Sequence, residues 1–174
     1  IYVSVKKSSV NLSVPQNLKY NHQTERFSFD PVSNAASYTL KIGDKEVNIG
    51  NSTTFSLSDY ISNPYDRIVK VQVKANAAKY SYVFKNSNYT AEYNLYQASK
   101  VSNVQVVGGK LTFNKAINSN AVIYLGDEIL DTITTNSTDV EYDLTKLDEK
   151  YSGLQKQLRI ESVVKNSIKQ SGVE

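Results

Sequence analysis

The chain of 174 residues contains no cysteine, methionine or tryptophan, and its only histidine is His22. The lack of cysteine excludes disulfide bonds, thiolate metal sites and cysteine nucleophiles, and it leaves the redox compartment open. A histidine metal site or a Ser-His-Asp triad would depend on His22, which lies in a polar stretch typical of an exposed turn. We therefore expect no catalytic residues, no metal site and no cofactor.

Strong charge and long apolar runs are also lacking. Twenty basic residues against 17 acidic residues leave a net charge of +3, well short of the basic surface that binds nucleic acid. No apolar run approaches the ~18–20 residues of a membrane-spanning helix. We expect neither a nucleic-acid partner nor membrane insertion within this segment.

The acidic residues gather in two places. Asp127, Glu128 and Asp131 form one set, and Asp143 with Asp148 and Glu149 forms the other. Sets of this kind are usually solvated turns, and the first falls in a predicted hairpin. A calcium site between tandem sandwich domains is the alternative that the sequence leaves open. Glycine-rich phosphate loops, zinc-ligand spacings and nucleophile elbows are missing.

What the sequence does contain is an alternation of apolar and polar residues. The clearest case is residues 69–75, where Val and Ala alternate with Lys and Gln. This period of two indicates an antiparallel strand with one face on a core and the other in water. Shorter runs of the same kind occupy residues 26–30, 38–42 and 55–57, with turn signals between them. Only residues 143–151 look helical, as one or two turns.

The second half of the chain repeats the first. The matching segments are residues 26–32 with 110–116, 40–47 with 123–130, Leu57 with Leu144, and 71–75 with 158–162. We predict two domains, at residues 13–97 and 98–174, and the last strand of the second is short or incomplete. Residues 1–12 are interpreted as a linker or as the closing strand of an upstream module. The chain is then a segment of a longer array. The alternative is that the strand at residues 1–5 adds to an open sheet edge, in the same chain or in another copy.

Several short motifs carry a family resemblance. In the first repeat they are Val14-Pro15-Gln16-Asn17-Leu18 as the first strand, Phe29-Asp30-Pro31-Val32 as the second strand with its exit, residues 36–42 as the third, and residues 69–75. Each repeat thereby resembles a fibronectin type III module or, more loosely, a bacterial immunoglobulin-like β-sandwich. The family commonly has Trp where Phe29 and Phe113 stand, and Lys115 replaces the family's Pro in the second repeat. The tyrosine corner is out of register in both repeats.

The resemblance implies an all-β fold of two tandem sandwiches, each with its own core. The side chains expected to point inward are Phe29, Tyr38, Leu40, Ile42, Leu57, Val71 and Val73 in the first domain and Phe113, Ile123, Leu125, Leu144, Leu158 and Ile160 in the second.

The functional prediction is a non-catalytic spacer or adhesion segment of a secreted or cell-surface protein, expected to be bacterial. Its partners are then the neighbouring modules of the same polypeptide, and a surface protein or glycan is a further candidate partner. One alternative is a glycan- or protein-binding module with a Tyr-rich patch of Tyr80, Tyr82, Phe84 and Tyr89, because Tyr gives rigid contact area at low entropic cost. The same residues also fit an ordinary hairpin whose tyrosines half-cover the sheet. A second alternative is an accessory part of a larger secreted enzyme.

Overall fold

A computed structural model describes residues 9–147, 151, 153, 155–168 and 170–171. The chain divides into two compact units, which we call unit 1 and unit 2. Unit 1 comprises Ile1–Pro64, Ile68–Leu95 and Gln170–Glu174, and unit 2 comprises Tyr65–Arg67 and Tyr96–Lys169.

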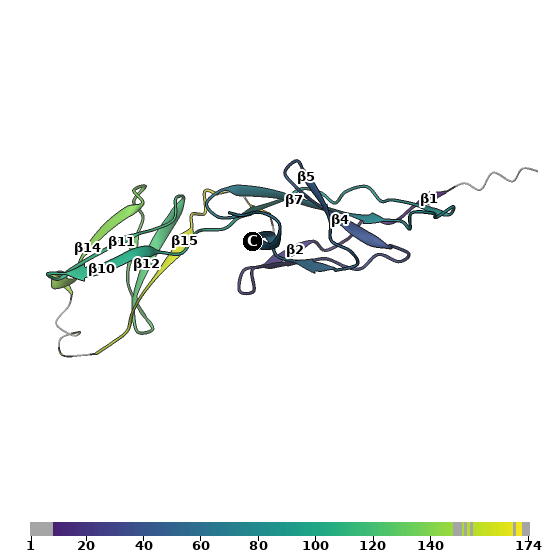
Figure 1. Ribbon diagram of the computed structural model, residues 1–174. Helices are drawn as coiled ribbons and strands as arrows, with labels where there is room; N and C mark the ends of the chain where they lie inside the picture. Colours follow the sequence, from purple (N-terminus) through teal and green to yellow (C-terminus); the bar gives the residue numbers. More distant parts are fainter. Residues whose placement is uncertain (1–8, 148–150, 152, 154, 169, 172–174) are drawn as a thin grey trace, which may run out of the picture. The chain divides into compact units, whose positions relative to one another are not determined.

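Unit 1 is a β-sandwich of two sheets. One sheet has the order β2-β3-β6, formed by β2 (Lys19–Asn21), β3 (Arg26–Ser28) and β6 (Thr54–Phe55). The other has the order β5-β4-β7-β9, formed by β5 (Lys45–Asn48), β4 (Ser37–Ile42), β7 (Ile68–Asn76) and β9 (Tyr93–Tyr96). Figure 1 shows β2 in a layer apart from β4, β5 and β7. A 3-10 turn, η1 (Leu57–Asp59), follows β6.

The alternation in β4 and β7 explains their pairing. Leu40 lies opposite Val73, and Ile42 lies opposite Val71. All four of these side chains are buried, whereas the intervening residues face outward. Because successive side chains of a strand point to opposite faces, this register places the apolar residues of β4 and those of β7 from Val69 onward on the core side, and only Ile68 at the start of β7 is exposed.

Aromatic rings dominate the core of unit 1. Phe27 is completely buried and stacks on Phe55, with 5.0 Å between ring centroids. Phe29 packs edge-on against Tyr38, whose ring centroid is 4.8 Å away. The Tyr38 hydroxyl also accepts a hydrogen bond of 2.8 Å from Val32 N–H, which fixes the loop before β4. All seven side chains expected in the first core are buried.

Unit 2 has the same plan. One sheet has the order β10-β11-β14, formed by β10 (Ser102–Val107), β11 (Lys110–Asn114) and β14 (Asp139–Asp143). The other has the order β13-β12-β15, formed by β13 (Glu128–Ile133), β12 (Ser119–Leu125) and β15 (Leu158–Val164). The 3-10 turn η2 (Leu144–Lys146) follows β14 as η1 follows β6. The matched residues Leu57 and Leu144 thus each open a 3-10 turn.

The core of unit 2 differs in part from the prediction. Phe113 and Ile123 are buried, and Leu144, Leu158 and Ile160 pack against the core while remaining partly exposed. Leu125 is wrong as a core residue. It is the last residue of β12, directly before the turn at Gly126, and it remains partly exposed. The buried residues that complete this core are Leu111, Ala121 and Val140.

The beginning of unit 1 also differs from expectation. Residues 14–18 form no strand. Pro15 has no N–H for a ladder, and Asn17 has a left-handed φ of 57°, so the strand pairs only from Lys19. Upstream, β1 (Val10–Asn11) pairs in parallel with β8 (Phe84–Lys85), and Leu12 is buried in the first core. The segment interpreted as a linker therefore contributes to unit 1 from Val10 onward, and residues 1–8 lie outside the described residues.

Candidate functional site

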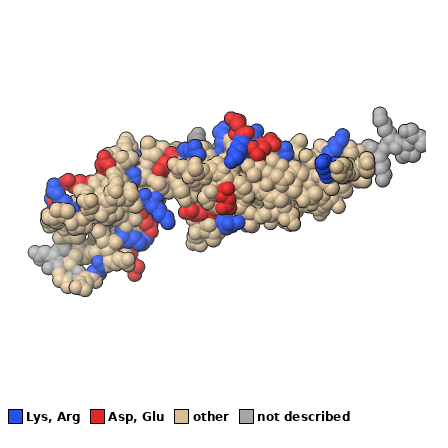
Figure 2. Space-filling view, viewed as in Figure 1, with Lys and Arg blue, Asp and Glu red and all other residues tan. Residues whose placement is uncertain are grey.

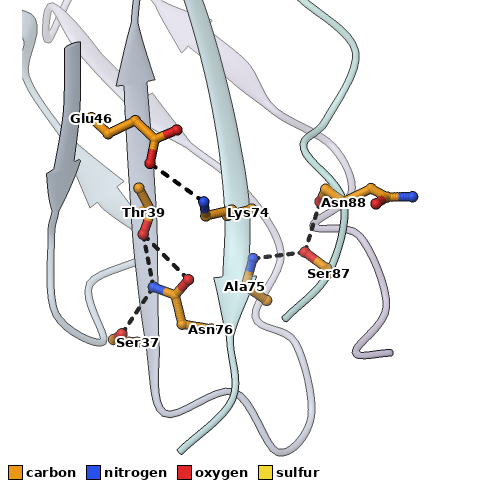
Figure 3. Close-up of polar contacts among 8 residues, drawn as sticks. All are labelled: Ser37, Thr39, Glu46, Lys74, Ala75, Asn76, Ser87 and Asn88. Carbon is orange, nitrogen blue, oxygen red and sulfur yellow. Dashed lines mark hydrogen bonds and ion pairs between the residues drawn. The ribbon is translucent and has the colours of Figure 1, made fainter. Parts of the chain in front are cut away.

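The outer face of sheet β5-β4-β7-β9 carries a connected set of polar side chains. Asn76 donates from its amide nitrogen to Thr39 Oγ1 at 2.9 Å and to Ser37 Oγ at 3.1 Å. Asn48 donates to the same Ser37 hydroxyl at 3.2 Å. Figure 3 shows Ser37, Thr39 and Asn76 clustered at one end of β4 and β7. They occupy the alternate positions of each strand that the core does not use.

A charged cluster adjoins this network. Lys74 Nζ lies 3.4 Å from Glu46 Oε2 and 4.5 Å from the centroid of the Tyr89 ring, and Lys41 Nζ lies 5.7 Å from the same centroid. The Tyr89 hydroxyl and then the Lys74 ammonium hold the pKa of the Glu46 carboxyl below its usual range. Burial raises the pKa of Tyr89. At neutral pH the cluster thus presents a neutral phenol between charged groups.

A shallow, open groove of about 890 Å³ lies over these residues. Its lining is rich in amides and hydroxyls and contains three lysines and no acidic residue. Residues of this lining include Thr39, Asn48, Asn76, Lys74, Lys79 and Phe84. The chain that borders it is held beside β7 by hydroxyl groups. Ser87 Oγ accepts from Ala75 N–H at 2.8 Å, and Thr90 Oγ1 accepts from Val73 N–H at 3.1 Å (Figure 3 shows the first).

The four residues of the predicted Tyr-rich patch have different surroundings. Tyr80 and Tyr82 lie between β7 and β8 and are 76% and 83% exposed. Lys79 and Ser81, which adjoin them, line the groove. Phe84 lines the groove as well, but it is half-buried against the first core. Tyr89 lies over Lys74, itself a groove residue.

The hairpin interpretation of this stretch is correct only in part. The chain after β8 returns along β7, where Ser87 N–H donates to Ala75 O and Thr90 N–H donates to Val73 O, and β9 is the neighbour of β7 in the sheet. The segment that carries Tyr80 and Tyr82 lies outside this pairing, because β8, which follows it, pairs in parallel with β1. Tyr80 and Tyr82 consequently extend into solvent and do not half-cover the sheet.

The sequence analysis missed the amide and hydroxyl groups of the groove. Ser37 and Thr39 fall within residues 36–42, which are predicted only as a strand, and Asn48 is given no role. One feature of the sequence could have revealed these groups. The outward positions Ser37, Thr39 and Asn48 carry short hydrogen-bonding side chains, whereas the outward positions of residues 69–75 carry Lys and Gln. Their convergence depends on the pairing of Thr39 with both Asn48 and Lys74, which no local pattern specifies.

The remaining candidates are engaged in local structure. His22 packs edge-on against Tyr20 at 4.9 Å between centroids. Asp143 Oδ1 accepts from Thr145 N–H at 3.0 Å and caps η2. In the part of the chain that the structure describes, no three His, Cys, Asp or Glu side chains are grouped so as to hold a metal ion. Asp148 and Glu149 lie outside that part.

Surface charge and helices add two observations. On the face shown in Figure 2, basic and acidic side chains are interspersed, in keeping with the small net charge. Within the described ranges, the chain forms no helix of the length and apolarity needed to cross a bilayer.

The likeness of this chain to known proteins is structural. No protein-family model matches the chain, and no curated protein matches it. Among solved structures, the chain is similar to the central fibronectin-III array of RIM-binding protein, with 12% sequence identity and a TM-score of 0.34. The similarity covers 90% of this chain and 60% of that chain, so this chain spans less than two thirds of the array. The predicted all-β, fibronectin type III-like sandwich is confirmed, on the strand order and register of the sheets.

Proposed function

We propose that this chain is a non-catalytic segment of a secreted or cell-surface protein that acts as a spacer or in adhesion. The supporting observation is that units 1 and 2 repeat one strand plan, each around a core of its own. A spacer needs stable modules and nothing more.

The location is tested on cells that express the full-length protein. An antibody against this segment should label intact cells or the culture medium, and protease added outside should remove the label. Labelling only after the cells are lysed would contradict the proposal. A cytoplasmic protein of the same cells serves as the control for lysis.

The groove of unit 1 favours a second function, the binding of a polar ligand such as a glycan. Thr39, Asn48 and Asn76 offer donors and acceptors, Lys74 and Lys79 offer positive charge, and Tyr80 and Tyr82 offer exposed rings beside them. Pockets of this kind orient ligands through a few placed polar groups.

A glycan array compares the native chain with the double variant Tyr80→Ser/Tyr82→Ser and with Asn76→Ala. Both variants should lose the same ligands. The control is Val107→Ser, which removes a side chain of similar exposure in unit 2. A ligand that all three variants bind as the native chain does would exclude this groove as its site.

A further inference from the structure

β15 is an edge strand of unit 2, whereas the matching strand of unit 1 has a neighbour on both sides. β15 pairs with β12 through all seven of its residues. No other strand in the described residues pairs with β15, which ends the sheet order β13-β12-β15. Its counterpart in unit 1, β7, has β9 on the corresponding side. Unit 2 thus lacks the fourth strand of this sheet in the part of the chain that we describe.

The core beneath this edge is correspondingly less covered. Val71 and Val73 of β7 are completely buried, whereas their matched residues Leu158 and Ile160 remain partly exposed. On the opposite, outward face of β15, Val163 is 43% exposed. An edge strand that presents apolar side chains and unpaired backbone groups is a template for adding another strand.

The register of β12 and β15 shows which backbone groups are available. Lys165 N–H donates to Asn118 O, and Gly126 N–H donates to Gln157 O. Backbone bonds alternate along an antiparallel pair, so the odd-numbered residues of β15 bond to β12. The even-numbered residues point their N–H and C=O groups to the free edge; these are Leu158, Ile160, Ser162 and Val164.

The charges on this edge are self-complementary. Arg159 and Glu161 flank Ile160 on the outward face and contact each other within the chain. The Arg159 guanidinium also lies 3.9 Å from the centroid of the Tyr124 ring, which holds it on that face. An antiparallel second copy of β15, with Ile160 opposite Ile160, would place each Arg159 opposite Glu161 of the other copy.

We infer that β15 pairs with β15 of a second copy of this chain in that register. The even-numbered residues then bond across the two-fold axis, and the two Arg159–Glu161 pairs occupy non-hydrogen-bonded positions, where side chains are closest. Two three-stranded sheets become one six-stranded sheet. The contact is isologous and closes as a dimer.

The same charges exclude the neighbouring registers. The even-numbered residues stay in hydrogen-bonding positions only if the numbers of two residues that lie opposite each other add up to an even number. The two neighbouring registers therefore differ from the proposed one by two in this sum. One such shift places Arg159 opposite Arg159, and the other places Glu161 opposite Glu161. Like charges directly opposite each other destabilise a strand pair. The charge pattern therefore selects the register centred on Ile160.

Analytical ultracentrifugation of the full chain over a range of concentrations tests the proposal. The contact is a single strand edge, smaller than a standard interface, so a weak, concentration-dependent dimer is expected. Glu161→Arg and Arg159→Glu each turn two attractive pairs into two repulsive ones and should weaken association about tenfold or more. The control Glu92→Arg makes the same charge change in unit 1, where Glu92 contacts Lys70, and should leave the dimer unchanged.

A mixing experiment separates this register from general charge effects and from loss of folding. Glu161→Arg and Arg159→Glu, each monomeric alone, should form a heterodimer when mixed, and the double variant Arg159→Glu/Glu161→Arg should regain self-association. The melting profile of each variant checks that unit 2 is folded. A native chain that stays monomeric at about 1 mM, or variants that dimerise as the native chain does, would overturn the inference.

Discussion

The aromatic core of unit 1 allows a quantitative test through Phe27. Its side chain is 0% exposed, and its ring centroid lies 5.0 Å from that of Phe55, 5.2 Å from that of Tyr93 and 4.9 Å from that of Tyr20. Phe→Ala at a buried site costs ~3–5 kcal/mol. The three ring contacts place Phe27→Ala near the upper end of that range. A domain of this size has ~5–15 kcal/mol of stability in total, so unit 1 would lose about a third of its stability or more.

Urea denaturation followed by hydrogen exchange measures this loss unit by unit, because two-state analysis does not describe a chain of two units. Phe27→Ala should lower the protection of β7 amides and leave β12 amides unchanged. Phe29→Ala should act in the same direction, since Phe29 packs on Tyr38. The control Tyr82→Ala removes an exposed ring and should change stability by less than about 0.5 kcal/mol. Native-like protection of β7 in Phe27→Ala would refute the packing argument.

Two further predictions concern unit 2. Gly109 has a φ of +77°, and a Cβ there would lie 2.4 Å from Thr145 Cγ2, whereas Gly108 at φ +58° has nothing within 4 Å. Gly109→Ala should therefore lower the melting temperature of unit 2 more than Gly108→Ala, which carries only the left-handed backbone cost of ~1–2 kcal/mol. The Thr145 hydroxyl and N–H lower the pKa of Asp143, so its stabilisation is present above the unfolded-state pKa and is lost as pH falls through the folded-state value. The melting-temperature gap between the native chain and Asp143→Ala should close as the pH is lowered below about 4.

The sequence predicted the central strands β4 and β7 well because one face of each strand is apolar and the other is polar. In β4, and in β7 from Val69 onward, the alternation is uninterrupted and the apolar face is buried, so a shift by one residue would expose these apolar side chains. The repeat also placed Leu57 and Leu144 at equivalent turns. These features depend on local pattern, which a single sequence displays.

The features that were missed depend on contacts between distant segments. The parallel pairing of β1 with β8 joins Val10 to Phe84, and nothing near either residue specifies it. Lys115 stands where the family has Pro, yet its side chain is buried and donates to Ser119 O at 2.8 Å. The groove arises only when β5, β4 and β7 are in register. The sequence therefore suggested the Tyr-rich patch, whose role in binding stays a prediction, and it missed the amides beside this patch.

The two cores predict an order of unfolding. Fourteen buried apolar residues form the core of unit 1 and five form that of unit 2, counted over the described residues. Each fully buried large apolar side chain contributes ~1.5–3 kcal/mol, so unit 2 should open first, with β15 amides exchanging faster than those of β7. Pairing of β15 between copies would cover the exposed side of the second core, and association stabilises the folded form by mass action. The melting temperature of unit 2 should then rise with protein concentration while that of unit 1 stays constant; equal shifts in both units would contradict a contact confined to β15.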